Sequence, residues 1–123
     1  MKVYVYFNLH KRKFSVKAME GENKGRVVAH VDSIHLLDAV FKVSQAGRAR
    51  VLREQKKYVH AGVIGYWTED IEADRAMAAA TDCITYNPYK YDSFVNKSDD
   101  FAPVSKAAYA YLHDRQINAS FAQ

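Results

Sequence analysis

The amino-acid sequence predicts an α+β fold in which an antiparallel or mixed β-sheet of about five to six strands carries two or three packed helices. Two observations lead to this expectation. Nine tyrosines and six phenylalanines, together with frequent valine, favour strands over an all-helical bundle. Alternating apolar segments also follow one another early in the chain through short polar connections, which suits antiparallel pairing. The length of 123 residues fits a single domain over residues 1–123.

Four strands are expected in the first third of the chain. Residues 2–9 alternate between an apolar and a mixed face, and residues 14–19 repeat the pattern after a basic connection, so the two predict a hairpin. Residues 26–34 and 35–43 are the next candidates. The apolar alternation of the last one suggests a bend at Leu37-Asp38.

A basic helix is expected over residues 45–57, with Ser44 as its N-cap. Gly47 should weaken this helix by about 1 kcal/mol relative to alanine. Residues 58–67 then resemble a strand. Acidic residues after Thr68 suit the start of a second, alanine-rich helix, because carboxylates stabilise the positive end of a helix dipole.

The last part of the chain predicts two short strands and a final helix. Residues 82–96 hold two strand candidates around the turn signal Asn87-Pro88. Residues 105–120 fit two interpretations, because their alanine content favours a helix whereas their alternation suits a strand. We expect a helix there.

Positive charge is concentrated in the first half of the chain. Residues 1–60 carry 13 Lys and Arg against 5 Asp and Glu, a charge of +8, whereas residues 61–123 carry 5 against 9, a charge of −4. The sum is the net charge of +4. Such a distribution favours an anionic partner or pairing between the two halves of neighbouring copies.

The helix over residues 45–57 is the main candidate for binding nucleic acid, because it presents a broad basic surface beside a narrow apolar edge at Val51. Arginine and lysine on such a surface neutralise phosphates and release counterions. An ordinary solvated helix face is the alternative. The candidate binding residues are Arg50, Arg53 and Lys57 opposite the apolar edge, Arg48 and Lys56 beside it, and Lys11, Arg12 and Lys13 in the first connection.

A small histidine-based RNase or phosphodiesterase is a second hypothesis. His30, His35 and His60 lie on neighbouring strand-like segments, and paired histidines can cleave RNA by general acid–base chemistry. The alternative is that these histidines are isolated and hydrogen-bonded. No known metal-ligand spacing occurs, and no glycine-rich phosphate loop is present, so we expect no metal and no cofactor.

A self-associating structural or assembly protein is a third hypothesis, with a possible homodimer formed through the acidic and basic halves. No apolar stretch is long enough to span a membrane, and the N-terminus does not resemble a secretory signal. The single cysteine, Cys83, cannot form an internal disulfide. We therefore expect a cytoplasmic protein that binds no membrane.

Three segments resemble parts of small accessory proteins that tailed phages and prophages encode: GRVVAHVDSI, FKVSQAGRARVLREQKKYVHAGVIG and ITYNPYKYDSFV. The resemblance implies stoichiometric binding, as in host-defence inhibitors of the anti-CRISPR type, and brings no catalytic residue with it. Many such inhibitors are acidic mimics of DNA, which the basic first half disfavours. We therefore expect a non-enzymatic protein that docks on nucleic acid, or on a host nucleoprotein complex in the bacterial cytoplasm, through its basic helix.

Overall fold

The computed structural model describes residues 1–67 and 81–121, and these residues form a ten-stranded antiparallel sheet with a single α-helix. The expectation of five to six strands with two or three packed helices is therefore wrong. The helix expected after Thr68 falls on residues outside the described ranges. That the chain is a single domain stays a prediction.

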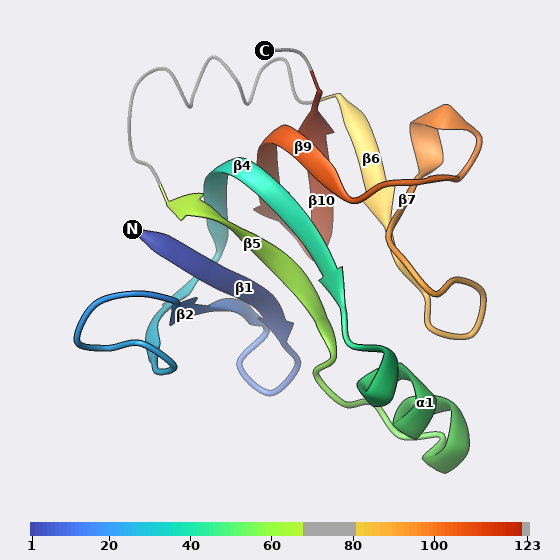
Figure 1. Cartoon of the computed structure of the whole chain (residues 1–123), viewed down its shortest axis with the longest axis horizontal. Coiled ribbons are helices and arrows are strands. Elements are labelled where there is room, and N and C mark those ends of the chain that lie inside the picture. Colours follow the sequence, from blue (N-terminus) through green and yellow to red (C-terminus); the bar gives the residue numbers. More distant parts are fainter. Residues whose placement is uncertain (68–80, 122–123) are drawn as a thin grey trace.

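Five strands and the helix come from the first 67 residues (Figure 1). They are β1 (Lys2–Asn8), β2 (Lys13–Ala18), β3 (Val27–Val31), β4 (Ser33–Val43), α1 (Gln45–Glu54) and β5 (Ala61–Trp67). The strands after the undescribed segment are β6 (Asp82–Thr85), β7 (Val95–Asn96), β8 (Ala102–Pro103), β9 (Lys106–His113) and β10 (Gln116–Ser120), with a short 3-10 helix at Lys97–Asp99. The strand order across the sheet is β3-β2-β1-β5-β4-β9-β10-β6-β7-β8.

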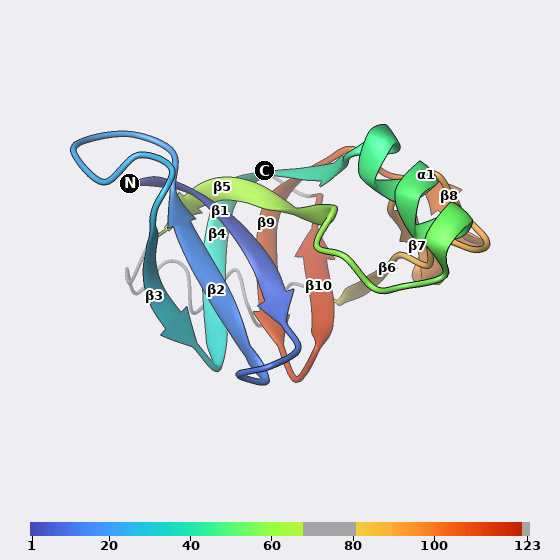
Figure 2. The same ribbon diagram turned by 90° about the horizontal axis from the view of Figure 1, so that it is seen from below.

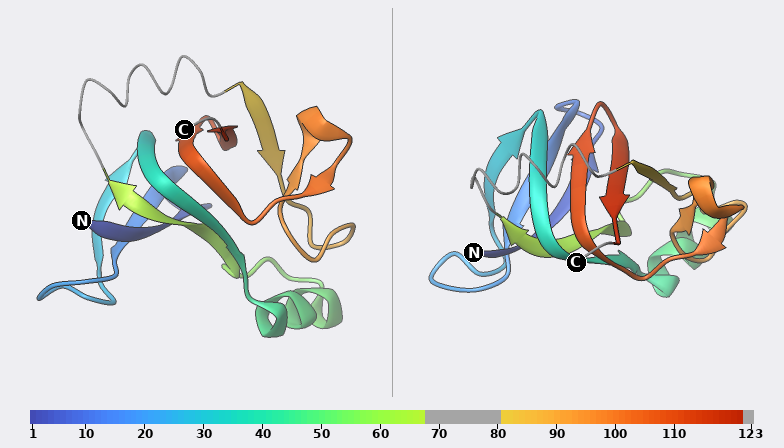
Figure 3. Two further views of the ribbon diagram at one scale, coloured as in Figure 1. Left: turned by 45° about the horizontal axis from the view of Figure 1, so that its top comes forward. Right: turned by 90° about the horizontal axis from the view of Figure 1, so that it is seen from above.

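The sheet has to curl because β3 and β4 are joined by one residue. Asp32 alone separates the two strands in sequence, yet they lie four places apart in the strand order. The end of β3 can meet the start of β4 only if the intervening strands bend round (Figures 2 and 3). The core lies inside this curl and includes Val3, Val5, Phe14, Val16, Leu36, Val63, Ala110 and Leu112, all buried.

Strand β4 contains the bend that its sequence predicts. Asp38 adopts a left-handed backbone with φ of 50°, and the pairing of β4 with β5 shifts register between Leu37 and Val40. The buried side chains slip by one position there, from Leu36 to Ala39. This irregularity lets an eleven-residue strand follow the curved sheet and keep apolar side chains inward on both sides of the bend.

The helix expected over residues 105–120 is wrong, because this segment forms the hairpin of β9 and β10. Ala110 and Leu112 point into the core, and Tyr111 lies on the opposite face beside His35 of β4. Alanine favours helices in isolation, but pairing of β9 with β4 along its length outweighs that small preference.

Helix α1 begins at the end of β4 and lies beyond the strand ends, not on a face of the sheet (Figure 1). Ser44 is its N-cap as expected, since its hydroxyl accepts a hydrogen bond of 3.1 Å from the Gly47 amide. The helix ends three residues earlier than expected, at Glu54, because Gln55 turns left-handed with φ of 55°. No helix among the described residues is long and apolar enough to cross a membrane.

Gly47 allows α1 to sit directly against the start of β5. A methyl group at this position would lie 2.5 Å from Cβ of His60, closer than real contacts allow. We therefore expect Gly47→Ala to lower the free energy of unfolding by about 1–3 kcal/mol through overpacking. Helix propensity alone predicts the opposite, a gain of about 1 kcal/mol. Denaturant unfolding distinguishes the two.

The matched control is Ala49→Gly on the exposed side of the same helix, which should cost about 1 kcal/mol through propensity alone. A Gly47→Ala protein at least as stable as the parent would contradict the close packing of α1 on His60.

Candidate nucleic-acid interface

The curl of the sheet brings three connections together at one end of the molecule. These are the β1–β2 turn, the Asp32 corner and the β9–β10 turn, which all lie at the lower edge of Figure 2. Two adjoining cavities of about 670 Å³ each lie at this end and share Phe7, Leu9, Lys57 and Arg115 in their walls. We call the two cavities together the groove.

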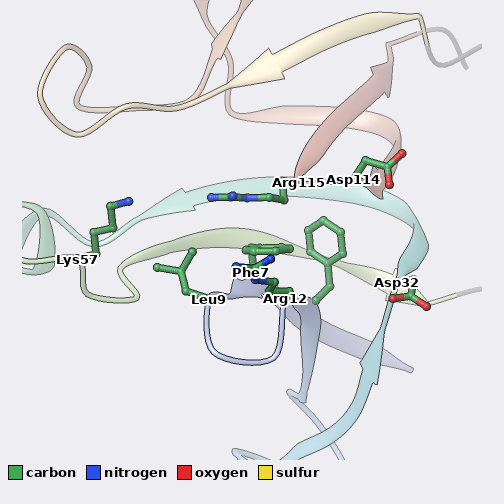
Figure 4. A pocket seen from close by; sticks show the side chains of 8 residues that line it. Phe7, Leu9, Arg12, Asp32, Lys57, Asp114 and Arg115 are labelled. Atoms are coloured by element: carbon green, nitrogen blue, oxygen red, sulfur yellow. The ribbon is translucent and has the colours of Figure 1, made fainter.

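Three cations from separate connections line the groove. Arg12 comes from the β1–β2 turn, Lys57 from the segment between α1 and β5, and Arg115 from the β9–β10 turn. All three are exposed, and none has a carboxylate partner among the residues that the structure describes. Figure 4 shows Arg12 and Arg115 near the middle of the first cavity and Lys57 at one end.

Two carboxylates, Asp32 and Asp114, lie at the other end of the first cavity (Figure 4). Each has a basic side chain beside it. Asp32 lies 3.8 Å from the ammonium group of Lys13, and Asp114 lies 3.5 Å from Nδ1 of His113. The described residues of the second cavity's wall include no carboxylate, so this part of the groove is more positive towards Lys57.

Both groove arginines sit in turns with left-handed backbone. Arg12 has φ of 55°, and Asp114 and Arg115 are the two residues between β9 and β10, with φ of 47° and 63°. Two-residue hairpin turns of this kind favour Asn-Gly. A side chain in the left-handed region costs about 1–2 kcal/mol per residue. The turn therefore holds Arg115 at a position where glycine would be more stable.

Arg115 is positioned by an aromatic ring. Its guanidinium carbon lies 5.0 Å from the ring centre of Phe7, and Figure 4 shows the two planar groups edge-on, one above the other. Phe7 in turn meets Phe14 edge to face, with ring centres 5.3 Å apart. This stack fixes the plane of the guanidinium without using its N–H groups, which stay available to an acceptor.

The second cavity has an aromatic wall organised around His60. Its Nδ1 lies 2.8 Å from the Tyr58 carbonyl oxygen, so this nitrogen carries the proton and donates. In the neutral ring Nε2 then accepts from the hydroxyl of Tyr86 at 2.7 Å. Burial raises the pKa of Tyr86, so its hydroxyl keeps the donated proton to higher pH than an exposed tyrosine would.

Arg48 ties α1 to the loop after β6. Its Nε donates to the carbonyl oxygens of Pro88 and Tyr91 at 3.0 and 2.9 Å, and Gln45 donates to the Asp92 carbonyl at 2.8 Å. The loop that carries Tyr89 is thereby fixed beside the groove. In the structure Arg48 thus bridges two segments of the chain.

Arg50 and Arg53 share the carboxylate of Glu54. The distances to its Oε2 are 2.8 Å from Arg50 Nε and 3.7 Å from Arg53. The guanidinium of Arg50 also covers the Tyr58 ring at 3.9 Å, and Tyr58 donates to Glu54 at 3.1 Å. The hydrogen bond from Arg50 holds the pKa of Glu54 below its usual value. Both arginines are thus partly neutralised within the chain.

The eight predicted binding residues therefore fall into three groups: those that line the groove, those near it, and those that make contacts within the chain. Arg12 and Lys57 line the groove, whereas Lys13 contacts Asp32 at its rim. Lys11 and Lys56 are exposed on the same two connections without lining either cavity. Arg48, Arg50 and Arg53 make the contacts within the chain described above.

The three histidines of the RNase hypothesis have different neighbours. Nδ1 of His30 lies 3.0 Å from the Ser15 hydroxyl, His35 packs on Tyr111 with ring centres 4.8 Å apart, and His60 bonds to Tyr86. Only His60 lines the groove. Among the described residues no three His, Cys, Asp or Glu side chains are grouped to hold a metal ion.

Sequence reasoning did not identify Arg115 or the aromatic residues of the loop after β6. The signal for Arg115 is the polar pair Asp114-Arg115 between two alternating segments, which marks a two-residue turn once the segments are taken as strands. Tyr86 and Tyr89 flank the expected Asn87-Pro88 turn, but the sequence alone does not show that this turn faces α1.

Comparison with known proteins identifies a family that matches nearly the whole chain. The family model of the Mycobacterium phage L5 gene 82 protein matches residues 1–120. The gene 82 protein of Mycobacterium phage L5 is 36% identical over an alignment 126 positions long, which covers 98% of this chain and 96% of that protein. No solved structure matches the chain.

Replacing Arg48 or Arg53 by glutamine tests whether Arg48 anchors the loop while Arg53 makes only an exposed ion pair. Arg48→Gln should lower the free energy of unfolding by about 1–3 kcal/mol, because two partly buried carbonyls lose their donor. Arg53→Gln should change it by less than about 0.5 kcal/mol, since its ion pair is exposed. Equal effects in denaturant unfolding would show that Arg48 does not anchor the loop.

Proposed function

This chain belongs to the family of the Mycobacterium phage L5 gene 82 protein, and we propose that it is a non-enzymatic phage accessory protein that binds nucleic acid in the groove. The supporting observation is the convergence of Arg12, Lys57 and Arg115 on one aromatic-lined surface without carboxylate partners among the described residues. In this proposal the binding site is the groove, and not the basic helix beside it that the sequence analysis expected.

Charge favours a polyanion as the ligand. The first 60 residues carry +8, and the groove is built largely from their turns. Cations without internal partners gain most from meeting phosphates, because condensed counterions are released from the nucleic acid when they do. Arg12 and Arg115 can also each donate two parallel hydrogen bonds to one phosphate.

Catalysis by histidines in the groove has less support than binding. His60 is the only one of the three proposed catalytic histidines in its wall, and both of its ring nitrogens are engaged by Tyr58 and Tyr86. A general base needs a free nitrogen near the substrate. We therefore favour stoichiometric binding, in which the protein holds its ligand without turnover.

A host nucleoprotein complex, as in host-defence inhibition of the anti-CRISPR type, would supply the same phosphates. Copurification from a bacterial lysate distinguishes this setting from free nucleic acid. If nuclease treatment releases every bound partner, the protein recognises nucleic acid itself. If one protein partner survives nuclease and high salt, the ligand is a protein surface and the proposal is wrong.

The groove cations should carry most of the salt-dependent affinity. We expect the triple change Arg12→Gln, Lys57→Gln and Arg115→Gln to weaken oligonucleotide binding about tenfold or more. The slope of log affinity against log salt should fall by about 2 for a single-stranded probe, because three phosphate contacts are lost. Fluorescence anisotropy at several salt concentrations measures both quantities.

The control is a second triple variant, Lys24→Gln, Lys42→Gln and Lys97→Gln. It removes the same number of positive charges, but at positions outside the groove. These lysines are exposed, and neither cavity includes them. An equal loss of affinity in both triple variants would mean that net charge alone attracts the probe, which contradicts a dedicated groove.

A further inference from the structure

We infer that the groove takes single-stranded nucleic acid, with phosphates at its cations and at least one base stacked on its aromatic and guanidinium planes. This inference rests on the proposed function and adds the strandedness of the ligand. It depends on three features: apolar groups exposed at the rim, the planar guanidinium of Arg115 stacked on Phe7, and the concave shape of the site.

The rim exposes large apolar side chains beside the cations. Val59 is 61% exposed, Tyr89 60% and Leu9 47%, and the three come from three different connections. A ligand that is only charged, such as polyphosphate, would leave these side chains in water. A ligand with alternating phosphates and flat apolar rings covers both kinds of surface, and single-stranded nucleic acid has this composition.

Arg115 offers a stacking plane as well as a charge. Phe7 covers one side of its guanidinium, and the ring and guanidinium planes lie parallel in the groove (Figure 4). Unpaired bases stack on arginine planes and on aromatic rings in many single-strand sites. The β9–β10 turn keeps this arginine in a left-handed conformation that glycine adopts without strain.

A duplex fits the site less well. Sequence-specific binding of double-stranded DNA commonly uses an element that protrudes into the major groove. Here the cations line a concave surface, and the single α-helix of the described residues uses Arg48 and Arg50 in contacts within the chain. Bases buried inside a duplex could not reach Tyr89 or the plane of Arg115.

The turn provides a matched pair of variants. Arg115→Gly and Asp114→Gly each relieve one left-handed residue of the same turn, and only the first removes the guanidinium. We expect Arg115→Gly to weaken binding of a labelled single strand of about 12 nucleotides by about tenfold. Asp114→Gly should bind at least as tightly as the parent, since it removes a negative charge from the rim. Neither should lower the melting temperature.

Base stacking is tested separately from charge at Tyr89. Tyr89→Phe keeps a ring and should bind the single strand like the parent, whereas Tyr89→Ala should bind several-fold to tenfold more weakly. The matching duplex should bind at least tenfold more weakly than the single strand and should respond equally to both changes.

The outcomes distinguish nucleic-acid binding in the groove from the preference for single strands. Equal affinity for single strand and duplex, with no difference between Tyr89→Phe and Tyr89→Ala, overturns the single-strand inference and leaves nucleic-acid binding standing. Binding of neither probe at low salt overturns both. Tight binding of an acidic peptide in place of the single strand also overturns both, because the groove would then recognise protein.

Discussion

The one-residue connection between β3 and β4 is the constraint on which the rest of the structure depends. Asp32 must carry the chain from one edge of the sheet to its fifth strand, so β3, β2, β1, β5 and β4 close round a common core. The same curl places the β1–β2 turn, the Asp32 corner and the β9–β10 turn at one end. Residues far apart in sequence thus line one groove, as the contact between Phe7 and Arg115 shows.

A second set of contacts holds the far wall of the groove. Gly47 lets α1 approach His60, His60 bonds to Tyr86, and Arg48 binds the carbonyls of Pro88 and Tyr91. These contacts join the first half of the chain to the loop after β6, although three strands separate β5 from β6 in the sheet. The groove therefore has fixed walls built from loops on a packed scaffold, an arrangement typical of binding sites.

Local sequence patterns correctly predicted the features that depend on interactions between residues close together in the chain. The alternation of β1 and β2, the bend at Asp38 and the Ser44 cap all follow from neighbours within a few residues. The helix expected over residues 105–120 failed because alanine propensity is small beside the pairing of β9 with β4. The groove itself could not be predicted, because a helical wheel places Arg48 on a face of α1 without showing that the loop after β6 covers it.

The most direct test of the groove is a titration of ¹⁵N-labelled protein with a short single-stranded oligonucleotide, followed by two-dimensional NMR. The account predicts that amide shifts gather in the connections at residues 9–12, 57–60, 86–89 and 114–115, while the outer face of β9 around Tyr111 stays unchanged. Shifts centred on Tyr111 and its neighbours, with the four connections unaffected, would contradict it.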